Sequence, residues 1–123
     1  MLREIPATRQ RHDEPARRWF TDERMDLTVW QDRAGEVIAF QLAYDRLDGE
    51  RALEWHRGTG FRHHRVDDGE TETGRHKQTP LLIPDGAIPR DRLLAEFRRR
   101  AAGLDESLRE VVIEALAGLP PQA

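Results

Sequence analysis

The sequence predicts an α+β domain: an antiparallel four- to five-stranded β-meander followed by two C-terminal α-helices packed on one sheet face. Between residues 25 and 67, apolar and polar side chains alternate, which is typical of half-buried strands. From residue 90 onward, apolar residues recur every three or four positions, which is typical of amphipathic helices. The chain has 123 residues, which fits one domain, and a run of strands followed by helices favours α+β architecture.

The first part of the chain is polar, interrupted by proline and without periodicity. We therefore expect a flexible N-terminal arm over residues 1–16 and a single α+β domain over residues 17–123. The large aromatic pair Trp19 and Phe20 is expected to anchor this arm to the domain.

The strongest alternation lies in residues 25–45 and predicts a hairpin with a turn that ends at Gly35. A four-residue loop would pair Val29 with Ile38. This register puts every large apolar residue of the hairpin except Trp30 on one face, whereas a slip by one residue would not.

The next predicted hairpin has a two-residue turn at residues 59–60. This turn would pair Trp55 with His64 on the core side, with His64 at the edge of the core. It would also place His56 opposite His63 on the other face. The pairing satisfies both the apolar sidedness and the placement of opposite charges across the strands.

Residues 67–79 contain no aliphatic or aromatic side chain and predict a long loop. The apolar run 81–83 is expected to form a fifth, edge strand or to plug the core. The two predicted helices carry opposite net charge, +3 over residues 90–100 and −3 over residues 104–119. We expect them to pack as an antiparallel pair with mutually attractive flanks.

Composition excludes several classes of function. Cysteine is absent, which removes disulfides, thiolate nucleophiles and cysteine-based metal sites, and Ser107 is the only serine. The formal net charge of −3 argues against nucleic acid or an anionic membrane as a partner. No stretch is long and apolar enough for a membrane span or a signal peptide, so we expect a cytoplasmic protein.

The first candidate site is the sheet face turned away from the helices. An exposed patch of this kind points to a protein partner or to self-association, and less to a small-molecule site, unless the N-terminal arm or one helix covers it. The residues predicted to form this binding surface are Thr28, Trp30, Gln41, His56 and His63.

The second candidate is a divalent metal bound by His56 and His63. As cross-strand neighbours they would have Cβ atoms about 5 Å apart, which permits shared ligation. Glu54 or Gln41 would add a ligand and leave positions open for water. The competing interpretation is a pair of ordinary solvated histidines, because no helical metal-binding motif is present.

The sequence thus favours a non-catalytic binding or protein-interaction module that uses its open sheet face and needs no cofactor. The alternative is a small metal-dependent enzyme with a histidine-based site on the sheet. A third hypothesis is a structural or regulatory subunit whose N-terminal arm, residues 1–16, becomes ordered on a partner.

Overall fold

The computed structural model describes residues 1–6, 16–47, 49–65, 78–80 and 88–120. Within these residues the chain forms strands followed by helices. The elements are β1 (Arg3–Ile5), β2 (Ala16–Thr21), β3 (Asp26–Gln31), β4 (Val37–Tyr44), β5 (Arg51–His56), β6 (Gly60–Arg65), β7 (Gln78–Pro80), α1 (Arg90–Arg100) and α2 (Glu106–Ala117).

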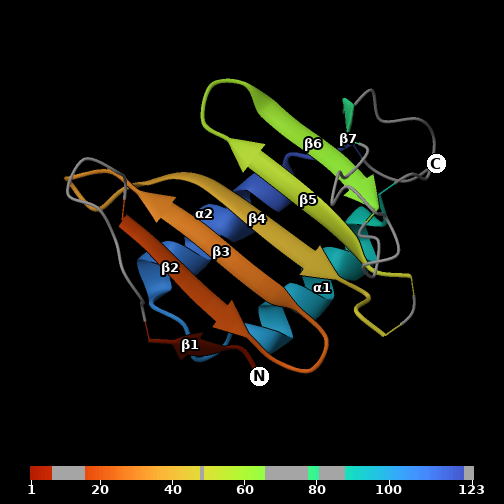
Figure 1. The fold of residues 1–123 in the computed structure, drawn as a ribbon, viewed down its shortest axis with the longest axis horizontal. Helices are drawn as coiled ribbons and strands as arrows, with labels where there is room; N and C mark the ends of the chain where they lie inside the picture. Colours follow the sequence, from red (N-terminus) through yellow and green to blue (C-terminus); the bar gives the residue numbers. More distant parts are fainter. Residues whose placement is uncertain (7–15, 48, 66–77, 81–87, 121–123) are drawn as a thin grey trace, which may run out of the picture.

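The strands form one antiparallel meander in which each strand pairs with its neighbour in the sequence, from β1 to β7. Both helices lie behind this sheet in Figure 1, on the same side. The predicted α+β class, the antiparallel meander and the two C-terminal helices on one face are therefore confirmed. The sheet has seven described strands, more than the four or five predicted.

One additional strand comes from the segment predicted to be a flexible arm. That prediction is wrong for residues 1–6, because β1 pairs with β2 and Leu2 is buried in the core. Arg18 holds the edge strand in place through a bidentate interaction with Glu4, with both N–O distances at 2.9 Å. A three-residue strand is too short to show alternation, so its sequence gave no signal. The rest of the predicted arm, residues 7–15, lies outside the described residues.

The hydrophobic core lies between the sheet and the helix pair. Alternation along the strands sends one set of large side chains toward the helices, and the helical stripes meet them there. The largest fully buried members are Met25, Leu27, Val29, Phe40, Leu42, Tyr44 and Leu53 from the sheet side and Leu93, Phe97, Val112 and Leu116 from the helices.

The two helices begin and end close to their predicted limits, and they form an antiparallel pair. Arg90 at the start of α1 donates a hydrogen bond to the carbonyl of Leu119, just beyond α2. Neither helix of the described chain is long and apolar enough to cross a membrane.

The expected attraction between the charged flanks of the two helices is not what the structure shows. Among the described residues, no ion pair joins α1 to α2. Arg92 instead binds Asp45 and Arg100 binds Asp22, each with a closest N–O distance of 3.0 Å. The arginines of α1 therefore attach the helix to the ends of the sheet rather than to its neighbouring helix.

The register between β3 and β4 differs from the prediction by two residues. Val29 pairs with Phe40 instead of Ile38, and an irregularity follows between Trp30 and Gln31. Because side chains repeat every two residues, a shift of two keeps each residue on its predicted face. The predicted sidedness is thus correct although the partner is wrong.

The register between β5 and β6 differs by three residues, and this odd shift reverses the predicted faces of β6. Trp55 pairs with Phe61 and not with His64, and His56 lies opposite Gly60. The turn lies earlier in the sequence than predicted because it is built around two glycines with positive φ, at Gly58 (87°) and Gly60 (95°).

The predicted loop and fifth strand fall largely outside the described residues. Nothing is described for residues 66–77 or 81–87, so the apolar run 81–83 is not assigned. The edge strand β7 instead covers residues 78–80, at the end of the predicted loop, and pairs with β6.

Asp22 joins the β2–β3 turn to the end of α1. Its side chain is only 2% exposed, and its Oδ2 lies 3.0 Å from Nη1 of Arg100. Its Oδ1 accepts the backbone N–H groups of Arg24 and Met25 at 2.7 and 2.8 Å. Burial alone would raise the pKa of Asp22, but these donors and Arg100 lower it below its usual value.

Replacing this carboxylate tests how firmly the contact holds the fold. Asp22→Asn keeps an acceptor for the turn but removes the charge facing Arg100. We expect the free energy of unfolding to fall by about 2 kcal/mol at neutral pH, the size of a charge-assisted hydrogen bond. The matched control is Glu23→Gln, an exposed neighbour, which should change stability little; denaturant titration of the three proteins measures both.

The difference in the free energy of unfolding between the wild-type protein and Asp22→Asn should depend on pH. The lowered pKa means that Asp22 stabilises the fold above its unfolded pKa of about 4, and that this stabilisation is lost as the pH falls through the folded value. The wild-type protein and Asp22→Asn should therefore converge in stability on acidification. A constant difference down to pH values well below that range would contradict this role.

Candidate functional site

The sheet face turned away from the helices, called the open face below, is toward the viewer in Figure 1. Strand pairing arranges its side chains in three rows that run across the strands. The rows are Ile5–Trp19–Thr28–Gln41–Glu54–Arg62, Arg17–Trp30–Ala39–His56–Gly60 and Arg3–Thr21–Asp26–Ala43–Ala52–His64.

Most of the predicted binding surface is assembled on this face. Thr28 and Gln41 are direct cross-strand partners in the first row, and Trp30 and His56 are joined through Ala39 in the second. These residues lie together because β3, β4 and β5 keep the sidedness that their alternation predicts.

His63 is the predicted site residue that lies elsewhere. It is opposite Leu53 on the side of the helices, whereas His56 is on the open face. The predicted metal pair of His56 and His63 is therefore not formed, and the odd register shift in this hairpin is the reason. Within the described residues, no group of three His, Cys, Asp or Glu side chains is placed to hold a metal ion.

The register shift brings a different histidine to the open face. His64, expected at the core edge beside Trp55, is instead buried near Glu54. The two Glu54 oxygens lie 3.9 Å from Nε2 of His56 and 3.8 Å from Nδ1 of His64. A half-buried carboxylate therefore lies between an exposed and a buried imidazole, near the middle of the face.

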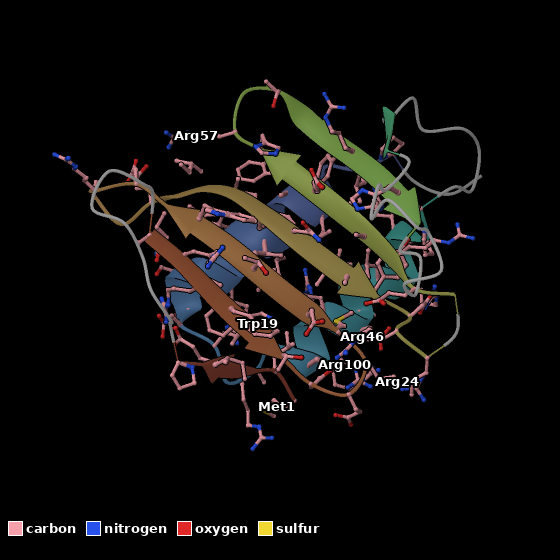
Figure 2. The ribbon with its side chains drawn as sticks, in the orientation of Figure 1. Met1, Trp19, Arg24, Arg46, Arg57 and Arg100 are labelled. Carbon is pink, nitrogen blue, oxygen red and sulfur yellow. The ribbon has the colours of Figure 1, made fainter. Side chains whose placement is uncertain are left out.

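Trp19 is the functional candidate that the sequence analysis missed. It lies on β2 in the open face, as Figure 2 shows, and its side chain is 46% exposed. Its neighbour Phe20 points the other way into the core at 2% exposure. The signal was present in the sequence, because two adjacent aromatic residues in a strand must face opposite sides.

Small side chains lie between the larger ones on this face. Ala39, Ala43 and Ala52 are all buried although they are on the side away from the helices. A methyl group rises little above the sheet, so taller neighbours shield it. The alanines lie in the two rows on either side of the middle row, which contains Thr28, Gln41 and Glu54.

Arginine outnumbers carboxylate on the open face. Asp26 is already matched by Arg46, whose Nε lies 3.5 Å from its Oδ2, and Glu54 lies beside the histidines. The arginines on or reaching this face are Arg3, Arg17, Arg46 and Arg62. Glu50 also lies 3.7 Å from the Nε of Arg46, so four arginines and three carboxylates lie on or at the edge of this face, although the whole chain carries a net charge of −3.

On the opposite face, His63 forms a polar pair with Tyr44. The Tyr44 hydroxyl lies 2.7 Å from Nε2 of His63, and the two rings are stacked with centroids 6.0 Å apart. Burial raises the pKa of the Tyr44 hydroxyl to about 12. Burial, with further contributions from Arg51 and His64, lowers the pKa of His63 to about 4.

These two pKa values indicate which group of the Tyr44–His63 pair holds the proton at neutral pH. At neutral pH the tyrosine hydroxyl is protonated and the imidazole is uncharged, so the O–H can donate to Nε2. Tyr44 is only 1% exposed, which keeps its hydroxyl away from any dissolved substrate. The pair therefore satisfies two polar groups beside the core rather than presenting an acid and a base to solvent.

No protein-family model, curated protein or solved structure matches this chain. The chemistry of the open face is therefore inferred from its own residues. The open face offers aromatic surface at Trp19 and Trp30 and hydrogen-bonding groups at Thr28, Gln41 and Glu54. These are groups that hold a partner by contact and hydrogen bonding.

The protonation state of His63 can be measured directly. We expect its imidazole resonances to stay in the neutral form through the physiological range and to titrate with a midpoint near pH 4. Because the unfolded histidine titrates at about 6.5, the unfolded state gains a proton first on acidification. The free energy of unfolding should thus fall as the pH drops from about 6.5 toward the folded pKa of about 4, because the unfolded state binds more protons in this range.

Imidazole proton or nitrogen NMR as a function of pH checks this result, with Tyr44→Phe as a companion. Removing the hydroxyl leaves the buried ring in place, so His63 should remain neutral at physiological pH. A midpoint between pH 6 and 7 in the wild-type protein would show that His63 is solvated and would contradict the paired geometry.

Proposed function

We propose that this protein is a non-catalytic binding module whose open face docks an acidic segment of another protein. The observation that carries this proposal is the position of Trp19, which is 46% exposed on a sheet face that neither helix covers. The proposal keeps the binding function that the sequence favours and moves its centre toward β2.

Trp19 is suited to anchor a partner. Tryptophan buries a large apolar area and is enriched among the residues that dominate binding energy. Ile5 and Thr28 flank it across the neighbouring strands. An aliphatic or aromatic side chain of the partner would pack against this group.

The charge of the face argues for an acidic partner. Arg3 and Arg17 lie on β1 and β2, on the strands next to and carrying Trp19, and both are exposed. Arginine binds carboxylates in a bidentate geometry and steers an oppositely charged surface into place. A segment with carboxylates on either side of an apolar residue would therefore match this end of the sheet.

The polar groups nearer the centre would define the position of the bound segment. Gln41 offers both a donor and an acceptor, and the Glu54 carboxylate beside His56 accepts hydrogen bonds. Ala39 and Ala43 are buried beneath taller side chains, so a bound segment would contact the polar groups around them. The face thus supports extended contact with a polypeptide.

Trp19→Ala tests the proposal without disturbing the core, since the side chain points away from it. We expect random peptides selected on the wild-type protein to be rich in Asp and Glu beside an apolar residue. The substitution should lower the affinity for the selected peptides about thirty-fold. This is the effect of losing a hot-spot residue worth about 2 kcal/mol. Affinity should also fall as the salt concentration rises.

Leu47→Ala is the matched control, because Leu47 is also exposed, at 72%, but lies in the turn after β4. It should leave peptide affinity unchanged. Selection of peptides without acidic residues, or binding that survives Trp19→Ala, would overturn the proposal. So would concentration-dependent dimerisation in sedimentation that Trp19→Ala abolishes, since the occupant would then be a second copy of this chain.

A further inference from the structure

Glu54 lies between two histidines on the open face, three strands away from Trp19. Its Oε1 is 3.9 Å from Nε2 of His56, and its Oε2 is 3.8 Å from Nδ1 of His64. The side chain of His56 is 54% exposed, whereas those of Glu54 and His64 are 17% and 4% exposed. One carboxylate is thus shared by an imidazole that a partner can contact and an imidazole that lies beneath the surface.

The charge of this group changes in the pH range where histidine titrates. With both imidazoles neutral, the group carries the single negative charge of Glu54. Histidine ordinarily gains a proton near pH 6.5, and carboxylates stay ionised there. Protonation of His56 brings the group to zero net charge, and protonation of His64 as well would make it positive.

The cross-strand neighbours of Glu54 do not change their charge in this range. Arg62 lies opposite Glu54 on β6, and Gln41 lies opposite it on β4. A guanidinium group stays positive and an amide group stays neutral. The two histidines are therefore the groups beside Glu54 that respond to mild acidification.

The surroundings of the two histidines add no further titration between about pH 7.5 and pH 5.5. The residues opposite them across the strands carry no ionisable group, and these are Ala39 and Gly60 for His56 and Ala52 and Gln78 for His64. His63 faces the other side of the sheet and, with its pKa lowered to about 4, stays neutral. Arg57 follows His56 in the chain and lies 3.9 Å from Asp32 and 3.5 Å from Glu36.

A segment held at Trp19 can reach this group. Trp19, Thr28, Gln41 and Glu54 follow one another across four adjacent strands. Three strand spacings amount to about 14 Å, which an extended chain covers in about four residues. A carboxylate about four positions from the apolar residue on Trp19 would therefore lie beside Glu54 and His56.

We propose that Glu54, His56 and His64 form a pH-sensitive contact for the acidic segment, so that the open face binds it more tightly at mildly acidic pH. This inference rests on the proposed function. With neutral histidines, Glu54 repels a carboxylate at this position. Once His56 is protonated, its exposed imidazolium donates a hydrogen bond to that carboxylate and pairs with its charge.

The test is the affinity of the full-length protein for a selected peptide at about pH 7.5 and pH 5.5, at constant ionic strength. The peptide carries Asp about four positions from its apolar residue. Its carboxylates, with ordinary pKa values near 4, are ionised at both pH values. We expect an affinity about five-fold higher at the lower pH, the effect of one exposed charge pair.

Substitutions assign this pH dependence to the proposed groups. His56→Gln should reduce the affinity ratio between the two pH values to less than about two-fold, and so should Asp→Asn in the peptide. Glu54→Gln should raise the affinity at the higher pH, because the repelling charge is removed. The matched control is Arg57→Gln, an exposed neighbour of His56, which should leave the ratio unchanged.

Two results would overturn this inference while the proposed function stands. The first is Trp19-dependent binding with equal affinity at the two pH values. The second is a pH dependence that persists in His56→Gln or with the Asn peptide. An absence of Trp19-dependent binding at both pH values would instead overturn the proposed function and this inference with it.

Discussion

The turn between β5 and β6 determines which side chains of β6 reach each face of the sheet. Gly58 and Gly60 adopt positive φ, which a residue with a Cβ rarely does, and the Thr59 N–H bonds to the His56 carbonyl across the turn at 3.1 Å. This turn pairs Trp55 with Phe61, so both rings lie on the side of the core. The side chains that β6 adds to the open face are a consequence of this register, because a shift by an odd number of residues would exchange the two faces of β6.

Two polar arrangements follow from the same register. His64 reaches the neighbourhood of Glu54 on the open face, and His63 reaches Tyr44 on the other. The arginines of α1 then hold the helical layer against the ends of the sheet. One face of the sheet packs against the helices, and the other carries the exposed Trp19.

Alternation and helical spacing were sufficient to predict the fold class, the two helices and most of the open face. They could predict the faces of β3 and β4 because an error of two residues preserves sidedness. They failed in the second hairpin because alternating sequences fit more than one turn, and only the backbone conformation of Gly58 and Gly60 distinguishes them. β1 was not predicted because three residues carry no periodic signal, and β2 with Trp19 was not predicted because clear alternation begins only at Met25.

The register of this hairpin is therefore the most direct quantity to measure. Cross-strand backbone nuclear Overhauser effects on the isotope-labelled protein report it without any substitution. The structure predicts contacts between Trp55 and Phe61 and between Leu53 and His63. Contacts between Trp55 and His64, with His56 opposite His63, would contradict it, because they would restore the histidine pair and remove His64 from the open face.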